Sequence, residues 1–190
     1  TITGTHTITA SYVTIDGFTL GPVIIDDSGV VAISGGTISN NIITGSSDGI
    51  RLGSNGAGSG IDHITIENNR ITANTGRGIA FYNAGDYAAQ RISYITISSN
   101  EITNNGSSGI STYGPGPNTI TNNIISNNNG NGISIKYDNG DVISGNTVTG
   151  NAAMGINMHQ VTNTLVENNS VSGHVSEAVV TTFWGGSIAA

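Results

Sequence analysis

The stretch Asn118–Ser172 contains one short phrase three times: Ile120-Thr-Asn-Asn123-Ile-Ile125, Ile143-Ser-Gly-Asn146-Thr-Val148 and Val166-Glu-Asn-Asn169-Ser-Val171. In each copy an apolar residue precedes an Asn by three positions and another follows it by two. The Asn positions advance by 23 residues at each step. A fixed period of this length, in units that cannot bury their apolar face alone, indicates a solenoid.

The same phrase extends back to the N-terminus. It recurs around Asn100, Asn69 and Asn41, and around Phe18 with Phe in the Asn position, at steps of 23, 28, 31, 23, 23 and 23 residues. Two coils therefore carry insertions, which we place at 53–62 and 83–93. A second anchor follows most of these Asn positions and pairs a small residue with an apolar one: Gly49-Ile50, Gly78-Ile79, Gly109-Ile110, Gly132-Ile133, Gly155-Ile156 and Ala178-Val179.

Each anchor has a physical reason at a corner of the coil. Asn tolerates left-handed backbone, and its amide can hydrogen-bond to the Asn of the neighbouring coils, which predicts an internal Asn ladder. We expect the Gly of the second anchor to supply positive φ at another corner. Three short strands per coil follow from this pattern.

These features resemble the right-handed parallel β-helix of the pectate-lyase-like superfamily, and the resemblance covers residues 12–182. It implies an all-β solenoid of about seven coils of 23–31 residues, with Ile, Val and Leu stacked inside. We read residues 1–190 as a single domain. Because an open solenoid end exposes strand edges and no cap precedes the first coil, we expect the chain to be a segment of a longer protein, with a flanking domain or another chain packed end to end on the N-terminal coil.

Composition limits the classes of function. The 190 residues include 36% hydrophobic and 9% charged residues, with a formal net charge of −7 and no cysteine. Sequence-independent nucleic-acid binding needs a basic stripe, which five Lys and Arg residues do not provide. The sequence has no apolar run of membrane-span length. Chains of this Asn-, Thr- and Gly-rich type are typically secreted or displayed at the cell surface, and we expect that location here.

Strand alternation assigns outward positions after each Gly-Ile anchor. The first outward row is Arg51, Ala80, Ser111, Ser134, Asn157 and Val180, and the second is Gly53, Tyr82, Tyr113, Lys136, His159 and Thr182. We predict that Tyr82, Tyr113, Lys136 and His159 form a continuous ladder on this face. Five of the six tyrosines, Tyr82, Tyr87, Tyr94, Tyr113 and Tyr137, are expected on or beside it. Aromatic rings with a polar tip suit sugar binding, although Tyr is also a good strand residue.

The other faces carry rows of Thr. Thr14, Thr37, Thr65, Thr96 and Thr119 point outward from one strand of each coil, and a second row of Thr and Ser follows the Asn corner. The simplest interpretation is structural, because Thr favours a solvated sheet face. An ice-binding plane is the less favoured alternative. The other histidines, His6, His63 and His174, lie on different coils, and we expect them to be solvated or turn residues.

The resemblance to polysaccharide lyases and uronate C5-epimerases implies chemistry on the tyrosine face. Such enzymes remove the proton beside a uronate carboxylate, which requires a neutralising cation, a base and an acid. Lys136 would act as base or neutraliser, and Tyr113 and His159 would share acid and base work. Arg51 would hold a carboxylate, beside substrate contacts from Tyr82, Tyr87 and Asn157. Ca²⁺ is a candidate cofactor, with Asp138 and Asp141 as candidate ligands or as residues that tune Lys136.

Several family signatures are absent. The sequence has no Asp-Pro-His motif of alginate epimerases, no clear set of pectate-lyase Ca²⁺ carboxylates and no paired-Asp pattern of polygalacturonases. The sequence therefore leaves two functions open. One is a polysaccharide-interacting protein, with lyase or epimerase as the activity if it is an enzyme. The other is a non-catalytic segment of a surface adhesin, fibre or phage tailspike.

Overall fold

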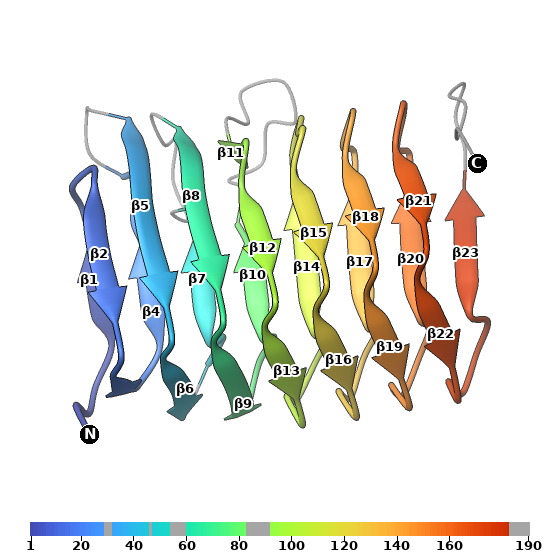
Figure 1. The fold of residues 1–190 in the computed structure, drawn as a ribbon, viewed down its shortest axis with the longest axis horizontal. Helices are drawn as coiled ribbons and strands as arrows, with labels where there is room; N and C mark the ends of the chain where they lie inside the picture. The colour runs from blue at the N-terminus through green and yellow to red at the C-terminus, as the bar shows by residue number, and fades with distance from the viewer. Residues whose placement is uncertain (29–31, 46, 54–59, 83–91, 183–190) are drawn as a thin grey trace.

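The computed structural model describes residues 1–28, 32–45, 47–53, 60–82 and 92–182. Their strands form three parallel sheets that run along one long axis, with the chain passing from sheet to sheet in each coil (Figure 1). The first sheet follows the order β1 (His6–Ile8), β4 (Val23–Ile25), β7 (Ile50–Leu52), β10 (Ile79–Phe81), β14 (Ile110–Tyr113), β17 (Ile133–Lys136), β20 (Ile156–His159) and β23 (Val179–Thr182).

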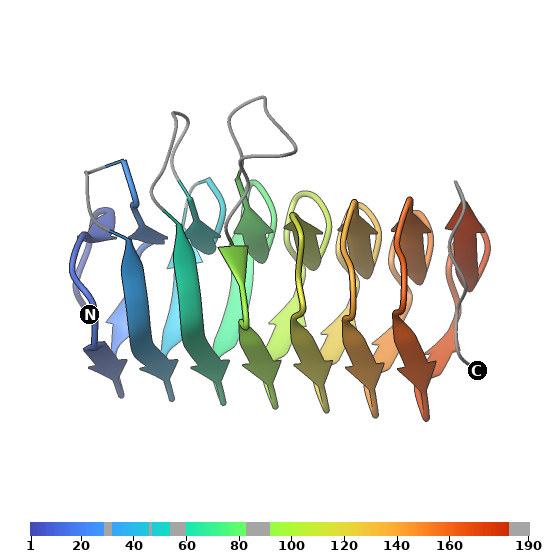
Figure 2. The same ribbon diagram turned by 90° about the horizontal axis from the view of Figure 1, so that it is seen from above.

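The second and third sheets each stack seven strands, one per coil. The second contains β2 (Val13–Asp16), β5 (Ile33–Ser39), β8 (Ile61–Glu67), β12 (Thr96–Ser98), β15 (Thr119–Thr121), β18 (Val142–Ser144) and β21 (Leu165–Glu167), and β11 (Ile92–Ser93) also pairs with β8. The third contains β3 (Thr19–Leu20), β6 (Ile42–Gly45), β9 (Arg70–Asn74), β13 (Glu101–Thr103), β16 (Ile124–Ser126), β19 (Thr147–Thr149) and β22 (Ser170–Ser172). Figure 2 shows the coils side by side in chain order. The strand orders of the three sheets confirm a parallel β-helix of about seven coils over the described residues.

The interior is built from stacked aliphatic side chains. Ile66, Ile97, Ile120 and Ile143 occupy paired positions on successive strands of the second sheet, and all four are fully buried. Burial of each side chain contributes about 1.5–3 kcal/mol to the stability of the fold. Because neighbouring coils bury each other's inward face, the repeat phrase read from the sequence is also the repeat of the core.

The Asn ladder predicted from the sequence is present. The ladder consists of Asn41, Asn69, Asn100, Asn123, Asn146 and Asn169. From Asn69 onward, the Oδ1 of each member accepts two hydrogen bonds from the Asn one coil earlier, one from its backbone N–H and one from its side-chain N–H, at 2.9–3.1 Å. The first member, Asn41, accepts the backbone N–H of Phe18 instead. The left-handed residue is the one before each ladder Asn, for example Asn122 with φ 56°, and not the ladder Asn itself. The predicted corner is therefore confirmed, but its left-handed residue lies one position before the ladder Asn.

The reason given above for the Gly of the second anchor is wrong. Gly78, Gly109 and Gly132 are absent from the positive-φ residues. A Cβ on Gly132 would lie 2.3 Å from Cγ1 of Val148 and 2.7 Å from the carbonyl oxygen of Gly155. These glycines are needed because the neighbouring coil and the core approach the backbone closely, which leaves no room for a side chain.

A second ladder, not predicted, runs along the corner that follows the third sheet. Asn74, Asn105, Asn128 and Asn151 are buried and hydrogen-bond from coil to coil in the same way as the first ladder. His174 ends it: its Nδ1 accepts the Asn151 backbone N–H at 3.1 Å, and its Nε2 lies 3.1 Å from the Val148 carbonyl oxygen. The expectation that His174 is a solvated or turn residue is therefore wrong.

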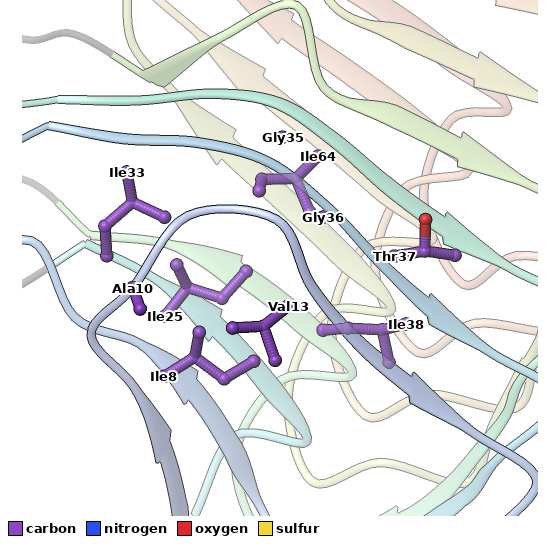
Figure 3. A pocket seen from close by; sticks show the side chains of 10 residues that line it. All are labelled: Ile8, Ala10, Val13, Ile25, Ile33, Gly35, Gly36, Thr37, Ile38 and Ile64. Atoms are coloured by element: carbon purple, nitrogen blue, oxygen red, sulfur yellow. The ribbon is translucent and has the colours of Figure 1, made fainter.

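A small apolar hollow lies in the core near the N-terminal coils (Figure 3). It has a volume of about 10 Å³ and is lined by residues such as Ile8, Val13, Ile33 and Ile64. Such a volume holds one water molecule at most, and apolar hollows of this kind stay empty. This hollow is therefore a packing gap and not a ligand site. No helix in the described ranges is long and apolar enough to cross a membrane.

Candidate functional site

The predicted outward row of the first sheet forms from Tyr113 to His159, whereas the strand pairing of β10 and β14 ends before Tyr82. Tyr113 pairs with Lys136, Lys136 with His159, and the parallel row places Ser134 beside Asn157. Neighbouring strands are about 4.8 Å apart, so Tyr113 and His159 stand two coil steps apart along the axis. Lys136, the middle member, is exposed and makes no ion pair within the described part of the chain.

These side chains line an open groove of about 320 Å³, formed by Tyr113, Lys136, Tyr137, Asn157 and His159 and called the groove below. Tyr137 holds the middle of it. Its ring lies edge-on to Tyr113, with centroids 5.2 Å apart and planes at 68°, and edge-on to His159, at 5.6 Å and 89°. The groove therefore places three rings, one ammonium group and one amide on the same outer surface.

Tyr137 holds a more central place in the groove than the sequence indicated. It directly follows Lys136, the last residue of β17. Strict alternation would point it into the core. Its φ of 59° is left-handed, and its side chain lines the groove beside that of Lys136. Its backbone N–H donates to the His159 carbonyl oxygen at 3.0 Å, which ties this corner to the next coil.

A second polar cluster lies on the same face, toward the N-terminal coils. The Arg51 guanidinium lies 4.7 Å from the centre of the Tyr82 ring, and that of Arg77 lies 5.4 Å from it. Burial, with a smaller contribution from a hydrogen bond to Asp48, raises the pKa of Tyr82 above its usual value. The Asp48 carboxylate also accepts the Arg77 backbone N–H at 2.6 Å. Arg51 and Tyr82 are thus brought together, as predicted, with Arg77 as a third member that sequence reasoning missed.

Asp138 and Asp141 do not lie on the outer face. Both are 1% exposed, inside the corner between β17 and β18. Asp138 Oδ2 accepts the Thr112 hydroxyl at 2.9 Å, and Asp141 Oδ1 accepts the Asn118 backbone N–H at 2.7 Å. Burial, followed by the charge of Asp141, raises the pKa of Asp138 well above its usual value, and burial raises the pKa of Asp141 to about 6.

The Ca²⁺ expectation finds no support in the arrangement of these residues. Ca²⁺ takes six to eight oxygen ligands, whereas the pair supplies two carboxylates inside the solenoid. In the described part of the chain, no three His, Asp or Glu side chains gather closely enough to hold a metal ion. Asp138 and Asp141 therefore do not form a Ca²⁺ site by themselves.

The remaining tyrosines divide differently from the prediction. Tyr94, between β11 and β12 of the second sheet, stacks on His63 of β8 with centroids 5.0 Å apart and planes at 10°. The register of β5, β8 and β11 puts Gly35, His63 and Tyr94 in one row, and the Tyr12 N–H bonds to the Gly35 carbonyl oxygen. Tyr94 therefore lies in the same row as Tyr12 on the second sheet, although it was expected on or beside the face of the first sheet. Tyr87 lies outside the described residues.

The Thr row of the second sheet is confirmed in register. Thr14, Thr37, Thr65, Thr96 and Thr119 pair in sequence across five strands. The row then ends, because Val142 and Leu165 take the next two positions.

Comparisons with known proteins agree with this architecture. Residues 1–171 match the model of the family described as "Right handed beta helix region". This match covers most of the chain, so the chain belongs to the right-handed β-helix family, and the predicted handedness is confirmed. A search of curated proteins finds no match.

Among solved structures, the chain is similar to the A-module of the mannuronan C-5 epimerase AlgE4 of Azotobacter vinelandii, with a TM-score of 0.51, 16% identity and coverage of 94% of this chain and 65% of that one. It is also similar to a double mutant of the periplasmic alginate epimerase AlgG, with a TM-score of 0.56, 15% identity and coverage of 99% and 51%. Tailspike protein 2 of bacteriophage CBA120 gives a TM-score of 0.48 at 12% identity, with coverage of 95% and 36%. At these identities the likeness shows the fold, and the chain spans 65% or less of each of these three proteins.

Proposed function

We propose that this β-helix binds an acidic polysaccharide along its first sheet, with the groove as the central contact. The observation that carries the proposal is the register of the groove: aromatic, cationic and amide side chains from three successive coils lie in one line along the axis. A pyranose unit is about as long as one coil step, so a sugar chain lying along this axis meets equivalent positions on successive strands.

Each groove residue has a suitable chemical role. The rings of Tyr113 and Tyr137 provide apolar faces with a hydroxyl at one end, which matches the mixed surface of a sugar. The Lys136 ammonium group is a point charge that would neutralise a carboxylate. The Asn157 amide both donates and accepts hydrogen bonds to sugar hydroxyls. Arg51 would bind a further acidic group closer to the N-terminal end.

The finer proposal is a lyase or C5-epimerase reaction on a uronic-acid polymer. Lys136 would neutralise the carboxylate or take the proton from the adjacent carbon. His159 and Tyr113 stand on either side of Lys136 and would serve as acid and base. The two structurally similar alginate epimerases are named for action on polymers of this kind, which supports this choice of substrate. We also propose a secreted or cell-surface location, where such polymers occur.

A non-catalytic role is the second candidate. The last coils advance by a uniform 23 residues and carry two continuous ladders, which would make a rigid spacer. A spacer has no need of the groove side chains, whereas a binding protein depends on them.

The test separates these functions. Calorimetric titration with alginate, pectate and hyaluronan fragments should give binding that weakens at least several-fold in Lys136→Ala and Tyr137→Ala. Thr121→Ala, on the outer face of the second sheet, should bind like the wild type. Unsaturated product detected by ultraviolet absorbance would assign a lyase, and a changed uronate ratio in the polymer by NMR would assign an epimerase. Absence of binding to every acidic polymer would overturn the proposal in favour of the spacer.

A further inference from the structure

The corner between β17 and β18 contains two buried carboxyl groups that no cation neutralises. Within the described residues the ion pairs are His63–Asp62 and Arg70–Glu101, and neither involves Asp138 or Asp141. One oxygen of each carboxyl, Asp138 Oδ1 and Asp141 Oδ2, is completely buried and has no hydrogen-bond partner. A buried carboxylate without a partner is costly, so such a group takes up a proton instead.

Each carboxyl is held firmly by its other oxygen. Thr112, on the inner side of β14, donates to Asp138, and the Asn118 backbone N–H donates to Asp141. Asp141 belongs to a row of residues spaced by 23 positions. Asn118, one coil earlier, makes the equivalent bond, in which its Oδ1 accepts the Ile95 N–H at 3.1 Å. Thr164, which takes the next position of this row, is fully buried. Neither carboxyl can reach water without disturbing these contacts.

Among the described residues, no charged side chain forms an ion pair with either carboxyl. On β21, which pairs with β18, Glu167 is exposed and lies opposite Ser144. The titratable side chains on the neighbouring strands of the first sheet are Tyr113 on β14, Lys136 on β17 and His159 on β20. These three and Tyr137 line the groove on the outer side of the first sheet, whereas the two carboxyls are inside. The polar neighbours on the inner side, Thr112 and Asn118, are uncharged.

Residues 137–141 form the corner that contains both carboxyls, and they connect it to the groove. Tyr137 precedes Asp138 directly, and its ring is the one that contacts both Tyr113 and His159. The Tyr137 N–H bonds to the His159 carbonyl oxygen at 3.0 Å, and the Gly140 N–H bonds to the Thr162 carbonyl oxygen at 2.9 Å. Movement of Asp138 toward water would therefore displace Tyr137 from the middle of the groove.

We propose that Asp138 and Asp141 form a proton-holding pair that keeps the 137–141 corner closed and Tyr137 in place, and that loss of the proton opens this corner. The groove is then complete in acid and loosens as the pH rises. A proton on one orphaned oxygen removes an uncompensated negative charge from the buried corner. The effect on the groove's ligand rests on the proposed function, whereas the effect on the corner does not.

The direction follows from the raised pKa values. A carboxyl whose pKa is higher in the folded protein than in the unfolded chain contributes stability below the unfolded value, and this contribution is lost as pH rises through the folded value. For Asp141 that window runs from 3.8 to about 6, and for Asp138 it runs from 3.8 to a pKa raised well above that value. Asp16, whose pKa is lowered by hydrogen bonds from Asn40 and Ser39, changes stability in the opposite direction.

Amide hydrogen exchange of the ligand-free protein tests the proposal. Protection of the Tyr137 and Gly140 amides, corrected for intrinsic exchange rates, should fall at least about tenfold between roughly pH 5 and pH 8, since one pKa unit is a factor of ten. The Gly150 amide, which bonds to Ser172 at another corner, is the internal control and should not change in this way. Asp138→Asn and Asp141→Asn keep the shape and the acceptor oxygen, so each alone should weaken the pH dependence of the protection, and the double variant should abolish it. Asp16→Asn should behave like the wild type.

Two results would overturn the proposal. One is the same pH profile for Tyr137 in wild type and in Asp138→Asn. The other is recovery of wild-type protection near pH 8 on addition of CaCl₂, without any response in the two Asn variants, which would identify a cation site in place of a proton site. Binding of uronate fragments, measured separately, can fail without affecting either result.

Discussion

Replacing Asn123 with Ala tests the Asn ladder at its centre. The Asn123 side chain makes four hydrogen bonds: its Oδ1 accepts from the backbone N–H and the side chain of Asn100, at 2.9 and 3.0 Å, and its Nδ2 donates to Asn146 Oδ1 and the Ile97 carbonyl oxygen, at 3.0 and 2.9 Å. Asn100 keeps other acceptors for its side chain, and Asn146 keeps the backbone N–H of residue 123. The buried backbone N–H of Asn100, however, loses the acceptor that it has in the native ladder.

An orphaned buried N–H costs about 1–3 kcal/mol, and the weaker losses add to it, so we expect a destabilisation of roughly 3 kcal/mol. At a urea dependence of about 2–3 kcal/mol per M, the unfolding midpoint measured by circular dichroism should fall by ~1 M. Asn139→Ala is the matched control. Its side chain is exposed and accepts from Thr162 and Asn163, each at 2.9 Å, so the cost should stay under about 1 kcal/mol. Equal midpoints for the two variants would refute the ladder as a source of stability.

Two further substitutions test other parts of the scaffold. Gly132→Ala should destabilise the protein by about 1–3 kcal/mol or more in thermal unfolding, because the new Cβ would meet Val148 and the Gly155 carbonyl. In the control Gly173→Ala the nearest atom is 3.6 Å away, so only the strain of its φ of 72° should matter. A harmless Gly132→Ala would contradict the close-packing explanation. His174→Ala should lose about 1–3 kcal/mol of unfolding free energy because it orphans the Asn151 N–H, while His174→Asn should stay within about 0.5 kcal/mol of wild type; equal losses in the two variants would show that His174 does not continue the ladder.

Much of the fold was readable from the sequence because a solenoid repeats its requirements at a fixed interval. The Asn positions specify the coil spacing, and alternation then assigns Tyr113, Lys136 and His159 to one outward row. Asn105, Asn128 and Asn151 share the same 23-residue step. The second ladder was nevertheless not predicted, because the Gly-Ile anchor four residues later already accounts for the repeat at that corner.

The features that alternation alone did not predict depend on single backbone angles and on burial. Tyr137 was expected on or beside the tyrosine face, although strict alternation would point it into the core; a left-handed φ, which Tyr rarely adopts, turns its side chain into the groove. Asp138 and Asp141 follow a strand in a polar turn, which normally predicts exposed carboxylates. The available signal was the position of Asp141, 23 residues after Asn118, in a row that points inward.

The most direct measurement of the proposed function is an NMR titration of the labelled protein with short uronate oligosaccharides. We predict that the largest chemical-shift changes fall on Tyr113, Lys136, Tyr137, Asn157 and His159, with smaller changes at Arg51 and Tyr82 toward the N-terminal coils. Changes centred on the Thr row of the second sheet, or no change with any uronate oligosaccharide, would contradict the assignment of the groove as the binding site.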